Sequence, residues 1–174
     1  GLGKTTMAAH VARAAFDKGA NVLFGHCEED LVTPYQLFAE TLRHYVTHAP
    51  EEDLRTHVAE HGSEIVRLVP ALAGRIPDLP PTKATDADSE RSLLFAAVVG
   101  MLASASAERP LMLLLDDVQW ADKGSLLLLR HLGIVDRPMR LLVVATYRDN
   151  ELKALIDTLA ALHRQTGVTR IELK

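Results

Sequence analysis

The chain has 174 residues, 48% of them hydrophobic, and a mean hydropathy of +0.06, which predicts one soluble globular domain with a sizeable core. Its net charge of −4 and pI near 6.1 argue against a general basic surface that grips nucleic acid. The single cysteine, Cys27, excludes an internal disulfide, and apolar runs such as Leu111–Leu115 are too short to cross a bilayer, so we expect a cytoplasmic protein.

The first third of the chain predicts a helix, a strand and a second helix. Apolar residues recur at helical spacing over residues 7–18, and Gly19 suits the position just after a helix end. Residues 20–25 are typical of a short buried strand. Pro34 can occupy the first turn of the next helix. The apolar face of that helix would comprise Leu37, Phe38, Thr41, Leu42 and Tyr45.

The middle of the chain predicts helices that are interrupted by a polar loop. Residues 50–80 favour one or two helices, and residues 80–89, rich in proline, threonine and aspartate, favour the loop. Ser89 or Asp88 can then cap a helix that runs through Ala105.

The last third alternates strands and helices. We expect strands over residues 111–115, 141–145 and 169–173, with helices over 125–132 and 152–163 between them. The continuous apolar runs of the first two strands are typical of parallel strands buried on both faces. Strands that alternate with helices predict an α/β fold with a mostly parallel sheet and right-handed crossovers.

The chain begins with six residues that match the second half of the phosphate-binding loop G-x-x-x-x-G-K-[ST]: Gly1, Leu2, Gly3, Lys4, Thr5 and Thr6. We expect the first glycine of the motif, and the strand that feeds it, to lie upstream. In such loops backbone N–H groups face the phosphates, so Lys4 would reach the β- and γ-phosphates and the Thr5 hydroxyl would ligate Mg²⁺. Taken alone, the segment also fits an ordinary glycine turn before a helix.

A pair of acids follows the apolar strand at residues 111–115. An apolar strand that ends in an acid supplies the Mg²⁺ partner in P-loop NTPases, which here would be Asp116. Asp117 lies where some of these enzymes place the group that polarises the attacking water. The alternative is that both acids only cap the following helix.

A third polar group follows the strand at residues 141–145. Its carboxyl end should lie on the same rim of the sheet as the first two motifs. Thr146 would hydrogen-bond the attacking water or the γ-phosphate, and Arg148 would sense the charge of the γ-phosphate. The alternative for Arg148 is an ordinary solvated side chain.

Together these segments resemble the AAA-type ATPase domain of STAND signalling ATPases, through residues 1–6, 113–122 and 145–152. More narrowly, they resemble large bacterial regulators that join such a domain to a LuxR-type DNA-binding, adenylate cyclase or protein kinase domain. The Trp-Ala-Asp at 120–122 is the most specific feature, and residues 90–95 also resemble the helix before the acidic strand. The similarity covers nearly the whole chain, but Gln119 replaces the histidine of many relatives.

The resemblance implies that residues 1–174 form a single, partial P-loop ATPase domain of the ASCE or AAA type. Such a domain is a three-layer sandwich, and here its first strand and C-terminal helical lid would be missing. The family implies ATP and Mg²⁺ as cofactors and slow hydrolysis that switches an attached effector domain outside this segment. The resemblance is also compatible with nucleotide-dependent self-association. Asp117 is one methylene shorter than the glutamate of fast motors, which is consistent with slow turnover.

Two other functions stay open at this point. One is a DNA-associated ATPase of the origin-recognition type, although the acidic balance and residues 120–122 speak against it. The other is a degenerate scaffold that binds nucleotide without hydrolysing it. Finally, the pairs His44/His48 and His57/His61 have the spacing of metal ligands on a helix, but no carboxylate or cysteine completes a recognised pattern, so we expect no metal there.

Overall fold

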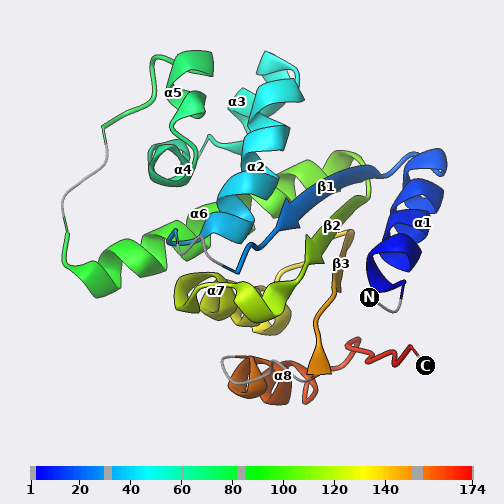
Figure 1. The fold of residues 1–174 in the computed structure, drawn as a ribbon. Coiled ribbons are helices and arrows are strands. Elements are labelled where there is room, and N and C mark those ends of the chain that lie inside the picture. Colours follow the sequence, from blue (N-terminus) through cyan, green and yellow to red (C-terminus); the bar gives the residue numbers. More distant parts are fainter. Residues whose placement is uncertain (1–2, 30–32, 60, 82–84, 150–154, 174) are drawn as a thin grey trace.

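Three parallel strands form the centre of the protein (Figure 1). The computed structural model describes residues 3–29, 33–59, 61–81, 85–149 and 155–173. The strands β1 (Asn21–His26), β2 (Leu111–Asp116) and β3 (Leu141–Ala145) lie in the order β1-β2-β3, so each crossover returns the chain to the neighbouring position. In the register of the sheet, His26 of β1 lies opposite Asp116 of β2. The carboxyl ends of the strands therefore meet at one rim.

One face of the sheet is covered by the helix α1 (Lys4–Asp17). Ala8 of α1 packs on Met112 and Leu114, which point to this face because side chains alternate along a strand. We call this side of the sheet the α1 face. The helix ends at Asp17 with Lys18 as its C-cap, and Gly19 follows with a φ of 88°, as predicted for a helix stop.

The opposite face carries the larger core. Leu111, Leu113 and Leu115 of β2 point into it and are at most 1% exposed. The helices α2 (Gln36–His48), α6 (Ala87–Glu108) and α7 (Lys123–Ile134) cover them. The result is the predicted three-layer α/β sandwich.

The helix α2 begins later than predicted. Tyr35 precedes it in the left-handed region with a φ of 58°, so Pro34 lies outside the helix instead of in its first turn. The predicted apolar face is nevertheless buried, and Phe38 and Leu37 are fully buried.

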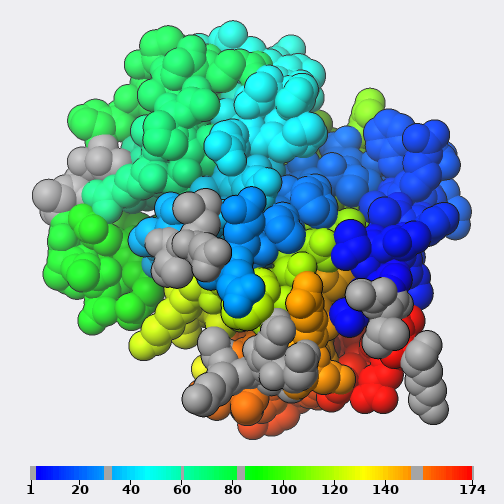
Figure 2. All heavy atoms as spheres, in the orientation of Figure 1, coloured from blue at the N-terminus to red at the C-terminus, as the bar shows by residue number. Residues whose placement is uncertain are grey.

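Residues 50–80 form three short helices where one or two were predicted: α3 (Glu51–His57), α4 (Gly62–Leu68) and α5 (Ala71–Arg75). They make a block on the side of the molecule away from α1 (Figure 2). Arg75 ties this block to α2, because its guanidinium donates hydrogen bonds to the carbonyls of Val46, Thr47 and Ala49 at the end of that helix.

The long helix α6 is capped by Asp86, and the predicted caps Ser89 and Asp88 lie inside it. The Asp86 carboxylate accepts hydrogen bonds from the backbone N–H groups of Asp88 and Ser89, which is the geometry of an N-cap. By length and composition α6 is apolar enough to cross a membrane, but half of its most apolar window is buried inside the fold. Its contacts are those of a core helix.

The last third departs from the prediction at two places. The helix α8 spans Ile156–Leu162, and the earlier part of the helix predicted over 152–163 lies outside the described residues. Residues 169–173 are described without strand structure, so the strand predicted there is wrong. A strand needs a neighbour for its hydrogen bonds, and this segment lies across a groove from β3, with Ile171 71% exposed.

The strand β3 is also less buried than its apolar sequence predicts. Every residue of β2 is buried, whereas those of β3 are half-buried or exposed, and Leu142 is 52% exposed. The reason is that β2 has a strand on each side, while among the described residues β3 pairs only with β2.

Candidate functional site

The rim at the carboxyl ends of the strands collects polar side chains on the α1 face. Asp116 follows Leu114 at a spacing of two, and His26 lies opposite Asp116, so both point to this face. Thr146 follows Val144 at the same spacing, and its N–H donates a hydrogen bond of 2.9 Å to the Leu115 carbonyl. The alternation of side chains along each strand and the register between strands therefore bring His26, Asp116 and Thr146 to the same face of the rim.

The N-terminus of α1 faces this rim. Gly3 precedes the helix with a φ of 72°, a conformation that glycine adopts readily, and no side chain caps the first turn. Lys4 is half-buried, whereas Thr5 and Thr6 are exposed. A helix start without a side-chain cap presents backbone N–H groups to an anion. Gly1 and Leu2 of the predicted loop lie outside the described residues.

Thr5 and Asp116 are in contact although 111 positions separate them in the chain. The Thr5 hydroxyl lies 3.2 and 3.3 Å from the two carboxylate oxygens of Asp116 and donates to them. On its other side the Asp116 carboxylate accepts a hydrogen bond from the Thr146 hydroxyl. Asp116 is only 4% exposed, so this carboxylate is held by two uncharged hydroxyls in a buried position.

This donor set fits a small, hard cation. A buried carboxylate and a threonine hydroxyl are oxygen ligands of the kind that Mg²⁺ prefers. A cation between them would also balance the negative charge of Asp116, which the hydroxyls do not neutralise. The residues predicted to hold Mg²⁺, Thr5 and Asp116, are therefore adjacent and chemically suitable.

Asp117 leaves the strand in a left-handed conformation, with a φ of 54°. This turn carries its carboxylate away from the strand direction, and its N–H donates 3.1 Å to the Thr146 hydroxyl. Because a non-glycine residue is strained in this region, the surrounding contacts must hold it there.

Gln119 holds two of the predicted residues, and the sequence interpretation gave it no role. Its side-chain N–H donates 2.9 Å to the Asp117 carboxylate, while its side-chain oxygen accepts 3.2 Å from the backbone N–H of Arg148. The Arg148 guanidinium itself lies 3.7 Å from the Asp117 carboxylate. Gln119 is 5% exposed, and both ends of its buried amide are paired. The signal in the sequence was its position, where many relatives have histidine.

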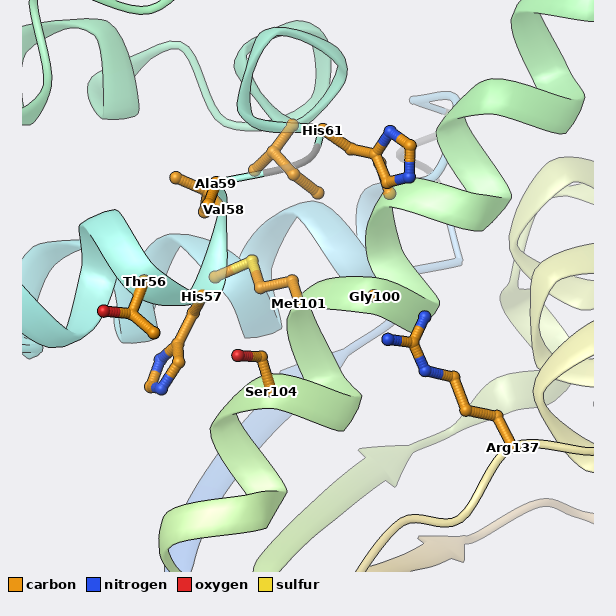
Figure 3. Close-up of a pocket in the computed structure, with 11 residues that line it drawn as sticks. Thr56, His57, Val58, Ala59, His61, Gly100, Met101, Ser104 and Arg137 are labelled. Atoms are coloured by element: carbon orange, nitrogen blue, oxygen red, sulfur yellow. The ribbon is translucent and has the colours of Figure 1, made fainter.

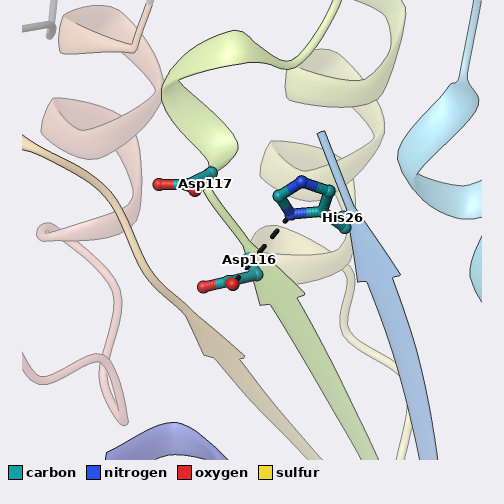
Figure 4. A group of neighbouring side chains, drawn as sticks. All are labelled: His26, Asp116 and Asp117. Atoms are coloured by element: carbon teal, nitrogen blue, oxygen red, sulfur yellow. Dashed lines mark ion pairs between the residues drawn. The ribbon is translucent and has the colours of Figure 1, made fainter. Parts of the chain in front are cut away.

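His26 is a second residue that the sequence interpretation missed. Its ring nitrogen Nδ1 lies 4.0 Å from the Asp116 carboxylate, and Figure 4 shows both side chains with Asp117 at the ends of β1 and β2. One ligand atom from each of these three residues lies within 4.8 Å of the others. The signal in the sequence was a histidine at the end of a strand that neighbours the acidic strand.

Negative charge dominates the rim beside His26. Cys27 follows His26, and burial raises the pKa of its thiol to about 12, with further contributions from the carboxylates of Asp122, Glu40 and Asp117. A thiolate is disfavoured there both by exclusion of water and by the neighbouring charges. The same field favours a bound cation.

The rim opens into a groove of about 1440 Å³ that runs along β3. Its polar end contains Lys4, Thr5, Asp117, Thr146 and Arg148. The rest is lined by α1, β3, α8 and the segment 166–173. All the predicted site residues that are described, apart from the buried Asp116, therefore line the same groove.

A second, smaller cavity of about 150 Å³ lies between the α3–α4 connection and α6 (Figure 3). Arg137, His61 and Ser104 reach it, and Gly100 of α6 leaves room between Arg137 and His61. His57 ends α3 and His61 precedes α4, so the predicted helical pair does not share a helix. The Tyr45 hydroxyl forms a hydrogen bond with Nδ1 of the His57 ring, and burial raises the pKa of that tyrosine.

In a comparison with protein-family models, a model described as an AAA ATPase domain matches residues 1–144, which include α1, β2 and most of β3. Comparisons with curated proteins and with solved structures returned no match. The family model covers well over half of the chain. The chain therefore belongs to the AAA ATPase domain family.

Proposed function

We propose that this domain binds ATP with Mg²⁺ and hydrolyses it slowly, as the switch of a larger signalling or transcriptional regulator. The observation that carries the proposal is the contact between Thr5 and Asp116, 3.2 Å long and 111 residues apart in sequence. It joins an open helix N-terminus to a buried acid, which are the two halves of a phosphate and metal site. The family match supports nucleotide binding.

In this proposal the start of α1 and Lys4 hold the phosphates. The first-turn N–H groups and the ammonium provide positive charge, which phosphate oxygens require. Mg²⁺, held by Thr5 and Asp116, would supply charge that offsets the developing negative charge on the phosphates. Thr146 positions Asp116 through its hydroxyl, so the loss of Thr146 would loosen the acid.

Asp117 is the group that we propose orients the attacking water. Its carboxylate accepts the Gln119 amide and lies near the Arg148 guanidinium, so its position depends on both. Arg148 follows β3 and lines the groove, where it would respond to the γ-phosphate. If Arg148 turns toward phosphate, it leaves Asp117 and frees the carboxylate for water. Gln119 couples the two residues, since it holds the carboxylate of one and the backbone of the other.

The wider context of the proposal comes from the resemblance to STAND ATPases. We propose a cytoplasmic domain whose nucleotide state controls a covalently attached DNA-binding, cyclase or kinase domain, with no direct nucleic-acid contact by residues 1–174. We further propose that the groove beside β3 seats the strand that feeds the phosphate loop, because the half-motif at the start of α1 calls for one. On this proposal the domain described is a partial one.

Titration with a fluorescent ATP analogue tests the function. Residues 1–174 should bind weakly and with a preference for Mg²⁺, and a longer natural chain that completes the phosphate loop should bind more tightly. Lys4→Ala should weaken both. Equal, tight affinity of the two chains would refute the partial-domain proposal. Binding that is unaffected by Lys4→Ala would refute the phosphate site.

A further inference from the structure

We propose that His26 is a ligand of the cation site beside Asp116 and Asp117, and that it gives this site a preference for transition-metal cations such as Co²⁺ over Mg²⁺. The inference rests on the proposed function in one respect: the same cation would serve the nucleotide. What it adds is a nitrogen donor from β1, a strand that carries neither the phosphate loop nor the acidic pair.

The first support is the strand register. His26 and Asp116 are direct partners on neighbouring parallel strands, so their side chains leave the sheet on the same face. This placement follows from the backbone pairing and does not depend on a flexible loop. The ring nitrogen Nδ1 and a carboxylate oxygen of Asp116 are 4.0 Å apart.

The second support is that the imidazole is held in place. The ring stacks on Phe24, two residues earlier on the same face, with ring centroids 6.5 Å apart and planes 6° from parallel. The backbone N–H of His26 donates a 2.8 Å hydrogen bond to the Glu40 carboxylate, which fixes the end of the strand. A metal ligand that is already oriented loses little conformational freedom on binding.

The third support is the size of the cluster. Ligand atoms of His26, Asp116 and Asp117 all lie within 4.8 Å of one another. An octahedral ion with bonds of about 2.1 Å places neighbouring ligands about 3 Å apart and opposite ligands about 4.2 Å apart. The 4.0 Å between His26 Nδ1 and the Asp116 carboxylate lies within this span, so these two side chains can ligate one ion. Figure 4 shows Asp117 beside them at the end of β2.

The fourth support is charge. The hydrogen bonds to the buried Asp116 carboxylate come from the hydroxyls of Thr5 and Thr146, which carry no charge, and the His26 ring lies 4.0 Å away. A divalent cation at the cluster would offset the charge of the buried Asp116 carboxylate.

The metal preference follows from the donor atoms. Carboxylate and hydroxyl oxygens suit Mg²⁺, whereas an imidazole nitrogen raises the affinity for later first-row metals, in the order Mn²⁺, Co²⁺, Ni²⁺. A site made of Thr5 and Asp116 alone offers oxygen donors that distinguish the two cations weakly. With His26 it becomes a mixed nitrogen and oxygen site, so the preference for Co²⁺ over Mg²⁺ should grow.

Calorimetry without nucleotide tests this on residues 1–174, with Co²⁺ and Mg²⁺ as the probes. His26→Ala should weaken Co²⁺ binding by about tenfold or more, the scale of a disturbed metal site. Mg²⁺ binding should change by less than about threefold, because its oxygen ligands stay. His26→Gln, which keeps a polar side chain of similar reach, should show the same loss and guards against a folding artefact.

Proton NMR of the Co²⁺ form identifies the ligand directly, because the N–H of a metal-bound imidazole is strongly shifted. The shifted signal should vanish in His26→Ala and persist in His48→Ala. The latter is the matched control, since His44 and His48 form an exposed pair on α2 with ring centroids 4.3 Å apart. A signal lost in His48→Ala but kept in His26→Ala would overturn the inference, as would equal Co²⁺ affinity in wild type and His26→Ala.

ATP binding is measured separately on the same samples. A wild type that binds Co²⁺ through His26 but does not bind ATP would reject the proposed function and keep the cation site. A wild type that binds ATP with Mg²⁺ but shows no His26-dependent Co²⁺ binding would keep the proposed function and reject His26 as a ligand.

Discussion

The side-chain amide of Gln119 donates a 2.9 Å hydrogen bond to the carboxylate of Asp117. Its other end accepts from the backbone of Arg148, so one buried residue ties the acid after β2 to the arginine after β3. The Arg148 guanidinium lies 3.7 Å from the same carboxylate, so a rotation of that side chain toward a nucleotide would remove a positive charge from beside Asp117. We propose that this pair adjusts the acid to the state of the nucleotide.

Asp117→Asn should leave ATP affinity unchanged and slow turnover by ~10²-fold or more, the usual scale for a general base. The amide keeps the size of the side chain but cannot accept a proton from water. Phosphate release under single-turnover conditions measures the rate, and equilibrium titration measures affinity. Normal hydrolysis in this variant would reject Asp117 as the base, and an inactive wild type would favour the scaffold function.

Lys4→Ala and Asp116→Ala should fail in different ways. Lys4 lies at the first turn of α1, so its loss should weaken nucleotide binding with or without Mg²⁺. Asp116 contacts Thr5 at the cation site, so its loss should remove mainly the part of binding that depends on Mg²⁺. Calorimetry at both conditions separates the two roles, and identical losses in both variants would contradict them.

Arg148→Ala should narrow the difference between ATP and ADP affinity. The expected change is about 1.5 kcal/mol, the lower end for a hydrogen bond to a charged group, because the Arg148 side chain is 51% exposed. Paired dissociation constants for the two nucleotides measure it. An unchanged ratio would assign Arg148 to the solvated surface.

Leu113→Ala and Leu142→Ala form a matched pair that tests the uneven burial of the sheet. Leu113 is fully buried, so its truncation should lower the free energy of unfolding by about 2–5 kcal/mol. Leu142 is 52% exposed, and its truncation should cost about 1 kcal/mol or less. Urea unfolding followed by circular dichroism compares them. Equal losses would mean that β3 is as buried as β2.

The buried thiol of Cys27 should make the free energy of unfolding fall at high pH. Burial and nearby carboxylates raise the pKa of the folded thiol from 9.0 to about 12, so between these values only the unfolded chain loses its proton. The contribution of the protonated Cys27 thiol to folding stability is therefore fully present below pH 9, and it is lost as the pH rises toward 12. Thermal unfolding at several pH values should show a steeper alkaline decline in wild type than in Cys27→Ala. Parallel declines would show that the thiol is not protected.

The sequence predicted the α/β class and the three parallel strands of the sheet, because these depend on local patterns. The short apolar run over 111–115 is typical of a buried strand, and two polar segments that follow neighbouring parallel strands lie at the same rim. Thr5 and Asp116 could be paired from the motifs alone, and the structure places them in contact.

What the sequence could not predict depends on distant neighbours. The half-exposure of β3 and the absence of a strand at 169–173 reflect which edges have partners, and apolar pattern alone does not encode this. His26 belongs to the site because of strand register, and Gln119 because of a turn with a positive φ at Asp117. The cap at Asp86 was missed because three nearby residues of similar capping ability compete for the position.

The open side of β3 also affects how residues 1–174 behave at high concentration. Among the described residues no strand covers this side, and Leu142 and the nearby Val11 and Met7 of α1 are exposed along the same groove. A strand edge with free backbone groups and apolar neighbours is a template for another chain. We expect concentrated samples of these residues to aggregate by edge-to-edge pairing, and a lysine at position 142 to improve solubility by placing charge in the groove.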